Sequence, residues 1–380
     1  MHGISRDYCV FTGAKDLEPI YSFKNFPVFM GCVEHPLSED KLFDMNWSIS
    51  QSSGSIQLNP MVPLEILYGQ SHGSGSIGRT WEKHHKAFAE FIAKQQRSKN
   101  ILEIGGGHGI TAKNYIDIVP ESNWTMVEPN PTNMDHPQIR VKKGFFTKDF
   151  QIEGKTDTVV HSHLLEHIYE PIDFFNQINH FLVEGSSMVF SIPNLKVMLD
   201  RCYTNCINFE HTIFFTEPYI EYALSKTGFE IIDKQYYLED HSIFYFTKKI
   251  NSKTIITIPL DLNESNKKCF NNYIQTHKIL IDILNQKLEE FQGQCYLFGA
   301  HIFSQYLISF GLNTKKIKGI LDNDSKKQGK RLYGTSLYVE SPKILKNKNN
   351  VAIIIRAGVF QNEIKSDILN NINSDVIFWE

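Results

Sequence analysis

The residue types and spacing with the clearest chemical meaning lie in a glycine-rich run, Ile101-Leu-Glu-Ile-Gly-Gly-Gly-His-Gly109. Its apolar start predicts a strand, and its glycines let the backbone approach a ligand where the next helix begins. Glu128 ends the next apolar stretch, where a carboxylate can accept hydrogen bonds from both hydroxyls of a ribose. The sequence therefore predicts a site for a nucleotide-type cofactor. The candidate residues are Glu103, Gly105, Gly107, Gly109 and Glu128.

The stretches around this run alternate between apolar strands and amphipathic helices, which is typical of an α/β domain with a parallel sheet. A helix precedes the run and carries Trp81, Phe88, Phe91 and Ile92 on one face. The expected strands are 101–104, 124–127, 158–161 and 187–192, and further helices are expected at 115–118 and 172–182. We therefore expect a Rossmann-like α/β domain over residues 63–249.

A second alternation of strands and helices follows a long amphipathic helix, whose apolar stripe runs from Phe270 to Phe291. The expected strands are 295–298, 317–321 and 351–355, and the expected helices are 302–310 and 363–372. Residues 250–380 therefore predict a smaller Rossmann-like domain. Residues 1–62 are rich in loops and predict a small separate module.

The composition limits the class of protein. The 380 residues carry 39 Lys+Arg and 42 Asp+Glu without a large block of one sign, which argues against a nucleic-acid-binding protein. No run approaches the roughly 18 apolar residues of a spanning helix, and the first residues do not resemble a signal peptide. Six cysteines are too few for a disulfide scaffold. We expect a cytoplasmic monomer or homodimer that does not act at a membrane.

Three motifs downstream indicate which cofactor the glycine-rich run binds. They are His163-Leu-Leu-Glu-His-Ile-Tyr-Glu-Pro171, Phe181-Leu-Val-Glu-Gly185 and Phe190-Ser-Ile-Pro-Asn194. With the glycines they resemble class I methyltransferases, which implies S-adenosylmethionine (SAM) as the cofactor and adds His163 to the cofactor-binding residues. In this resemblance, Glu166 and His167 mainly shape the cofactor pocket. The residues by themselves leave open an NAD-binding domain, or a glycine turn that holds no ligand.

The C-terminal part carries a pattern that resembles one methyltransferase family. Asp322-Asn-Asp-Ser-Lys-Lys-Gln-Gly-Lys-Arg-Leu-Tyr-Gly-Thr335 is similar to the C-terminal domain of the sugar C-methyltransferases of deoxysugar biosynthesis. The resemblance implies a nucleotide-linked sugar as substrate, with cations of this loop meeting its diphosphate. The alternative is a solvated basic loop on a structural domain. The cations concerned are Lys326, Lys327, Lys330 and Arg331.

The N-terminal part resembles the zinc module of the same family but lacks most of the metal ligands. The family has two Cys-x-x-Cys-Gly stretches, and the matching text is Cys9-Val-Phe-Thr-Gly13 and Ser50-Gln-Ser-Ser-Gly54. Three of the four ligand positions are thus Thr12, Ser50 and Ser53. Because structural zinc is bound by thiolates or imidazoles, we expect no metal.

A further stretch carries the candidate catalytic residues. Asn208-Phe-Glu-His-Thr-Ile-Phe-Phe-Thr216 resembles the family's Tyr-His-Glu-His-x-x-Tyr-Phe-Ser, which implies that His211 is the base and that Glu210 supports it. An imidazole titrates near neutral pH and can remove a proton that a neighbouring ketone has acidified. Asn208 stands where the family has a tyrosine, and this departure affects proton handling or the identity of the substrate.

Two other segments resemble parts of the family's sugar site. Tyr68-Gly-Gln-Ser-His72 matches a segment whose tyrosine reaches the sugar, so Tyr68 is a third catalytic candidate and His72 a weaker one. The alternative for this segment is a hinge loop. Glu239-Asp-His-Ser242 lacks the glycines of the family's His-Gly-Gly-Ser, so the resemblance assigns it no role.

The resemblance implies a SAM-dependent C-methyltransferase that acts on a nucleotide-linked keto-deoxysugar, as in polysaccharide or natural-product pathways. A base would form an enolate, and the enolate carbon would take the methyl group. One alternative is O- or N-methylation of a sugar or other small metabolite on the same scaffold. Another is a subunit that binds SAM or a nucleotide sugar without catalysis.

Overall fold

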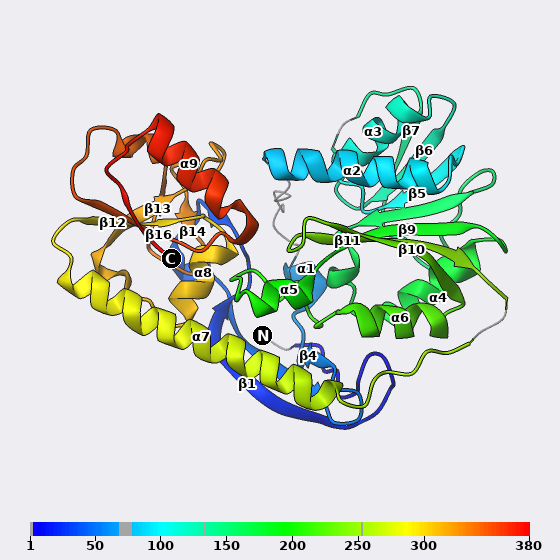
Figure 1. Ribbon diagram of the computed structural model, residues 1–380, viewed down its shortest axis with the longest axis horizontal. Helices are drawn as coiled ribbons and strands as arrows, with labels where there is room; N and C mark the ends of the chain where they lie inside the picture. The colour runs from blue at the N-terminus through cyan, green and yellow to red at the C-terminus, as the bar shows by residue number, and fades with distance from the viewer. Residues whose placement is uncertain (1–2, 68–77, 133, 252–253) are drawn as a thin grey trace.

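The computed structural model describes residues 3–67, 78–132, 134–251 and 254–380. Figure 1 shows two α/β units side by side, with the N-terminal strands and the long helix α7 (Leu262–Glu290) running along one side of both. Among the described residues, no helix combines the length and the apolar character that a membrane crossing requires.

A seven-stranded sheet forms the core of the larger unit, in the order β10-β11-β9-β8-β5-β6-β7. The strands from β9 to β7 run parallel, whereas β11 is antiparallel to both of its neighbours. The strand order reverses between β5 and β8, and ligands of open α/β sheets bind at the carboxyl ends of strands beside such a reversal. The bounds are β5 Asn100–Ile104, β6 Asn123–Glu128, β7 Ile139–Lys143, β8 Thr158–Ser162, β9 Ser187–Pro193, β10 Phe229–Tyr237 and β11 Ser242–Lys249.

Helices cover both faces of this sheet because successive strand residues alternate between two apolar cores. Ile101 of β5 packs in the core that α2 and α3 cover, and the next residue, Leu102, packs in the core that α4 and α6 cover. This arrangement confirms the predicted Rossmann-like α/β fold. The helix bounds are α2 Arg79–Gln95, α3 Ile110–Ile118, α4 Pro171–Phe181, α5 Leu195–Asp200 and α6 Glu217–Lys226.

The C-terminal unit contains a second, smaller sheet of five parallel strands in the order β15-β13-β12-β16-β17. Its strands are β12 Gln294–Phe298, β13 Ile317–Leu321, β15 Val339–Glu340, β16 Val351–Ile355 and β17 Ile377–Trp379. Its helices besides α7 are α8 Ile302–Ser309 and α9 Gln361–Asn371. Short 3-10 helices lie at η1 Leu37–Glu39, η2 Leu165–His167, η3 Thr314–Lys316, η4 Pro342–Leu345 and η5 Gly358–Phe360.

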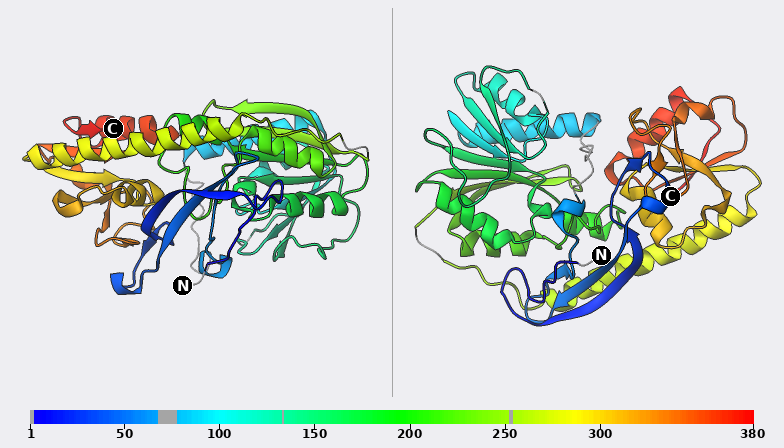
Figure 2. Two further views of the ribbon diagram at one scale, coloured as in Figure 1. Left: turned by 90° about the horizontal axis from the view of Figure 1, so that it is seen from below. Right: turned by 180° about the vertical axis from the view of Figure 1, so that it is seen from behind.

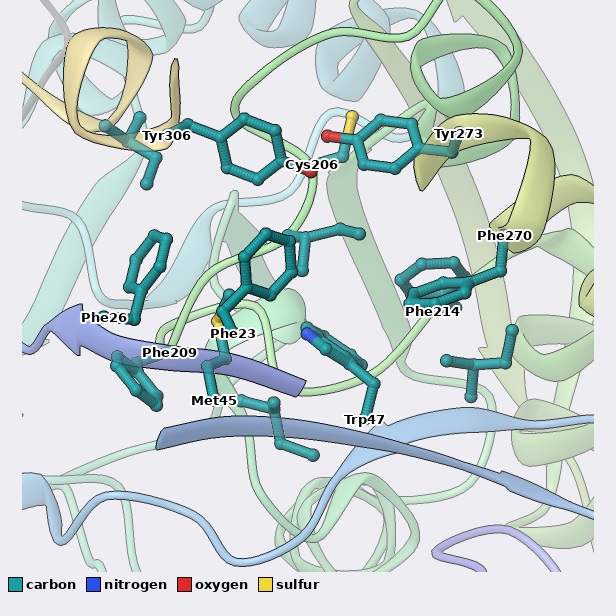
Figure 3. Packing of buried hydrophobic residues seen from close by; sticks show 14 of the residues in the cluster. Phe23, Phe26, Met45, Trp47, Cys206, Phe209, Phe214, Phe270, Tyr273 and Tyr306 are labelled. Carbon is teal, nitrogen blue, oxygen red and sulfur yellow. The ribbon is translucent and has the colours of Figure 1, made fainter. Parts of the chain in front are cut away.

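The N-terminal segment forms a three-stranded antiparallel sheet that packs against both units. Figure 3 shows Phe23 and Trp47 of this sheet in one cluster with Phe214 of the larger unit and Tyr306 of α8. Both views in Figure 2 show α7 running from the C-terminal unit toward the larger one, where it contacts α5. The remaining bounds are β1 Leu17–Pro27, β2 Cys32–Val33, β3 Leu42–Ser50, β4 Ile56–Leu58, α1 Leu64–Leu67 and β14 Arg331–Leu332, and β2 pairs with β14.

Candidate functional site

The glycine-rich run forms a tight turn between β5 and α3. Gly105 and Gly107 have φ angles of +75° and +53°, and Gly109 at +63° caps the start of α3. The positive φ of Gly109 favours glycine, and a Cβ there would also require the end of the Met134 side chain to move. A Cβ at Gly107 would meet nothing within 4 Å. The turn therefore presents backbone N–H groups at a helix start, which suits the polar end of a cofactor.

Glu128 lies at the carboxyl end of β6, directly beside this turn. One carboxylate oxygen accepts the backbone N–H of Gly107 at 3.4 Å, and the other accepts that of Asn130 at 3.1 Å. The structure thus brings Glu128 and the glycines together at neighbouring strand ends. The carboxylate keeps lone pairs with which it can accept hydrogen bonds from ribose hydroxyls.

Glu103 lies beneath the turn and is only 2% exposed. It accepts a hydrogen bond from the indole Nε1 of Trp124 at 2.8 Å, and a Cβ at Gly106 would lie 2.6 Å from its Oε2. Burial raises the pKa of Glu103 to about 7, against the smaller opposing effect of the Trp124 hydrogen bond. This carboxyl group supports the turn from below, and its contact with a cofactor stays a prediction.

His163 follows β8, the strand next to β5, so it lies at the same edge of the sheet. Its Nδ1 lies 3.3 Å from Glu166 Oε1, and its Nε2 lies 2.8 Å from the hydroxyl of Ser242. The hydroxyl of Ser242 also lies 2.6 Å from Nδ1 of His241. The backbone at His163 adopts a left-handed conformation, with φ +48°. These bonds hold the His163 ring at the edge where the glycines and Glu128 converge.

The histidines around His163 were not predicted as a group. His84 of α2 stacks on His241 with ring centroids 5.0 Å apart, and burial lowers the pKa of His84. Burial also lowers the pKa of His241 to about 3, so both rings are neutral at pH 7. Ring nitrogens of His84, His163 and His241 lie within 4.8 Å of one another. The sequence feature that could have revealed this group is the pair of adjacent histidines, His84 and His85, in the helix that precedes the glycine-rich run.

Glu210 and His211 lie together and are joined by His167. Nδ1 of His167 lies 3.5 Å from Glu210 Oε2, and the rings of His167 and His211 are 5.1 Å apart. Burial lowers the pKa of His211 to about 4, and His167 lowers it further, whereas Glu166 and Glu210 raise it. This pKa is below the near-neutral value that the sequence suggested. Our interpretation of His167 as only a pocket-shaping residue missed its place beside the candidate base.

Asn208, which stands where the related family has tyrosine, holds the local turn. Its Oδ1 accepts the backbone N–H groups of Glu210 at 2.8 Å and His211 at 2.9 Å, and its Nδ2 donates to the carbonyl of Asn205. The Oδ1 acceptor is therefore used within the chain, whereas Nδ2 has a second N–H to donate. Tyr68 and His72 lie outside the described residues.

Two cavities lie near these groups. The smaller, of about 10 Å³, is lined by Glu166 and His211 together with Leu195 and Met198 of α5. The larger, of about 210 Å³, lies where the two units meet and is polar. It is lined by Arg201, Tyr203, Thr204, Arg356, Gly358, Gln361 and Asn362. Arg201 is paired there with Glu239 and Asp240, so Arg356 is the guanidinium of this cavity that can bind an anionic group.

The basic loop of the C-terminal unit does not offer four free cations. Arg331 is buried and forms two hydrogen bonds of 2.7 Å with Asp40, so it is not exposed to a diphosphate, and the contact of this loop with the diphosphate stays a prediction. Lys327 lies 3.2 Å from Asp322, and Lys330 lies 3.3 Å from Glu34. The sequence showed the charges of this loop but not the acidic residues that neutralise them.

The N-terminal frame that resembles a zinc module is held by hydrogen bonds. Cys9 Sγ lies 3.2 Å from Ser53 Oγ, and Ser50 Oγ accepts the backbone N–H of Ser53 at 3.3 Å. Thr12 is exposed and accepts the backbone N–H of Ala14. One thiol and three neutral hydroxyls are a poor donor set for zinc, so the expectation of a metal-free module stays a prediction.

Residues 79–234 match the family model described as a methyltransferase domain. No curated protein matches the chain. Among solved structures, the chain is similar to a SAM-dependent methyltransferase from Clostridium acetobutylicum ATCC 824, with 14% identity, a TM-score of 0.34, and coverage of 45% of this chain and 92% of that one. It is also similar to the mitomycin 7-O-methyltransferase MmcR, with 13% identity, a TM-score of 0.36, and coverage of 49% and 62%. A third is the riboflavin-type dimethyltransferase RosA from Streptomyces davawensis, with 16% identity, a TM-score of 0.33, and coverage of 44% and 55%.

The family match covers the sheet edge at which the glycines, Glu128 and His163 converge. The glycine turn and the carboxylate at the end of β6 fit a nucleoside cofactor with a polar tail. This finding closes the NAD alternative. The chain contains a class I methyltransferase domain that uses SAM.

Proposed function

We propose that this chain transfers the methyl group of SAM to a carbon atom of a nucleotide-linked keto-deoxysugar. The observation that carries the proposal is the group formed by His211, His167 and Glu210, one short helix away from the sheet edge that holds His163. Proton abstraction next to a ketone requires a neutral base and a polar partner for the enolate oxygen. When bound, SAM supplies an electrophilic methyl group.

In the proposed reaction His211 removes the α-proton of the substrate. Its lowered pKa keeps the ring neutral and able to accept a proton at pH 7. The C–H bond electrons move toward the ketone oxygen and give an enolate. Bound SAM would supply the methyl group for the enolate carbon, and the sulfonium S–C bond would break to leave S-adenosylhomocysteine. Glu210 orients His167, because its Oε2 faces Nδ1 of that ring. By fixing His167, Glu210 also fixes how the rings of His167 and His211 are arranged.

The enolate oxygen needs a hydrogen-bond donor. Asn208 accepts the backbone N–H groups of Glu210 and His211 through Oδ1, and its Nδ2 gives one of its two N–H groups to the carbonyl of Asn205. Because Nδ1 of His167 faces Glu210, we assign the enolate oxygen to the second N–H of Asn208 or to the hydroxyl of Tyr68. Tyr68, the third catalytic candidate, keeps its predicted role toward the sugar.

The diphosphate of the substrate is assigned to the polar cavity between the units, in place of the basic loop. Arg356 donates to the carbonyl of Cys202 at 2.9 Å, and Arg201 is paired with Asp240 and Glu239 at the cavity wall. Changing Arg356 to Gln should raise the KM for the sugar nucleotide and leave the SAM affinity unchanged. Lys326→Gln, in the basic loop, is the matched control and should leave both values unchanged.

The direct test is solvent exchange at the α-carbon of a nucleoside diphosphate-linked keto-6-deoxysugar in D₂O, followed by NMR without SAM. The wild type should catalyse exchange, and His211→Ala should lower the rate by roughly 10²–10⁴-fold while SAM still binds. Exchange that continues equally in the variant would assign the base elsewhere. NMR of the methylated product then shows whether the new methyl group is on carbon.

O-methylation is the second candidate, and the replacement of the family tyrosine by Asn208 favours it. A hydroxyl needs a base but no donor for an enolate oxygen, so the loss of the family tyrosine matters less. A product whose new methyl carbon has the chemical shift of a methoxy group, with no α-exchange, would support this alternative. Tight SAM binding without turnover of any sugar nucleotide would indicate a binding subunit.

A further inference from the structure

Glu166 is a buried carboxylate close to three histidines, His163, His167 and His211. It lies in η2, directly after the edge of the large sheet, and is 6% exposed. Its Oε1 faces Nδ1 of His163 at 3.3 Å. The carboxylate thereby selects the form of His163 that carries hydrogen on Nδ1, so that Nε2 accepts the hydroxyl of Ser242.

The second oxygen of Glu166 has no hydrogen-bond partner among the described residues. It belongs to a group in which ligand-type atoms of Glu166, His167 and His211 lie within 4.8 Å of one another. Glu166 and His211 also line the same small cavity beside α5. A buried carboxylate oxygen without a partner is costly unless a positive charge forms beside it.

We propose that Glu166 is a positioning residue whose charge stabilises the imidazolium that forms when His211 takes a proton. This inference rests on the proposed function, because it requires His211 to be the base. The arrangement has the logic of a catalytic triad, in which a buried carboxylate orients a histidine and balances its charge without taking the proton itself.

The charges around His211 are those of His163, His167, Glu166 and Glu210. Burial by itself would raise the pKa of Glu166, but the His163 hydrogen bond and the three nearby histidines lower it to about 2. Glu166 is therefore ionised throughout the pH range in which a histidine base works. Glu210 is already engaged by His167, so Glu166 is the carboxylate whose oxygen remains available to His211.

The sign of the effect follows from this charge. An ionised Glu166 favours protonated His211 and so raises its pKa, and Glu166→Gln should lower that pKa by about one to two units. A base with a lower pKa accepts the α-proton less readily, so turnover should fall by roughly 10- to 100-fold. The acidic limb of the kcat/KM profile should move to lower pH by the same amount as the pKa.

The test is a ¹⁵N-histidine NMR titration of the full chain with S-adenosylhomocysteine, in which His211→Asn assigns the His211 signal. A lowered His211 pKa in Glu166→Gln, restored in Glu166→Asp, supports the proposal. The control is Glu170→Gln, four positions further on, where the carboxylate accepts a hydrogen bond from Tyr8. This variant should leave the His211 pKa unchanged. An unchanged His211 pKa in Glu166→Gln would overturn the proposal. A divalent-metal requirement that this variant abolishes would also overturn it, by making Glu166 a metal ligand.

This titration needs no sugar substrate, so it separates the inference from the proposed function. If the His211 pKa moves but the wild type exchanges no α-proton, the charge coupling stands and the C-methylation proposal fails. If exchange occurs but the His211 pKa does not move, the C-methylation proposal stands and the charge coupling fails. A fold defect in Glu166→Gln would appear as a general change of spectrum, and Glu166→Asp then supplies the comparison.

Discussion

The ion pair between Asp40 and Arg331 should be structural, and this can be measured. The two side chains are 2% and 6% exposed and share two hydrogen bonds of 2.7 Å. Asp40 also accepts the backbone N–H of Gly334 at 2.6 Å, and Arg331 donates to the carbonyl of His35 at 2.9 Å. The pair therefore ties the N-terminal segment to the C-terminal unit, next to the pairing of β2 with β14.

Asp40→Asn would leave a buried guanidinium without its counter-charge. Removing one partner of a buried ion pair lowers the free energy of unfolding by about 3–5 kcal/mol. The asparagine side chain would still accept hydrogen bonds, but the three bonds that Asp40 accepts would lose their charged acceptor, which fits the lower part of that range. We expect a loss of about 3–4 kcal/mol in urea unfolding followed by circular dichroism. Arg331→Met should cost a similar amount, and the double variant should cost clearly less than the sum of the two.

The control is the exposed pair of Lys24 and Asp44, which also has an N–O distance of 2.7 Å but side chains 69% and 39% exposed. Asp44→Asn should cost less than about 1 kcal/mol. A loss of under about 1 kcal/mol in Asp40→Asn would refute the reasoning. An Arg331→Met variant of normal stability with a raised KM for the sugar nucleotide would also refute the reasoning, because it would indicate that Arg331 binds the diphosphate.

Three further predictions follow from the cofactor site and the N-terminal frame. Glu128→Ala should weaken SAM binding by about 1.5–3 kcal/mol in calorimetry, because a charged acceptor is lost, whereas Glu121→Ala on the surface should not. Neutral Glu103 stabilises the fold fully below about pH 4.5, and this contribution is lost as pH rises through about 7, so Glu103→Gln should flatten the fall in stability over that window. A wild type and variant with equal pH dependence would contradict this. Elemental analysis should find no stoichiometric zinc at Cys9, and about one zinc per chain after washing with chelator would show that the frame binds metal.

The sequence predicted the central strands of both α/β units well. The run 351–355 is β16, and 158–161 and 187–192 lie within β8 and β9. These strands are buried on both faces and therefore read as continuous apolar runs between polar breaks. The sequence also predicted the glycine turn after β5, because backbone with positive φ angles strongly favours glycine.

The features that the sequence did not reveal depend on partners far apart in the chain. The edge strand β10 shows no regular alternation of polar and apolar residues and pairs with β11 in a way that no local pattern specifies. Arg331 looked like a ligand-binding cation because Asp40 is 291 residues away. The contact of His167 with Glu210 was not predicted for the same reason, since the two residues approach only in the folded chain.

The places where the chain departs from the family pattern share a physical solution. Ser53 stands at a former ligand position and now hydrogen-bonds to Cys9, the remaining thiol. Asn208 stands at the tyrosine position and bonds the backbone of Glu210 and His211. In both places a short polar side chain keeps the local turn and gives up the chemistry of the residue that it replaces. In the proposed reaction His211 keeps its place in this turn while the tyrosine hydroxyl is replaced by an amide, and for this reason the outcome of α-proton exchange, rather than the fold, decides between carbon and oxygen methylation.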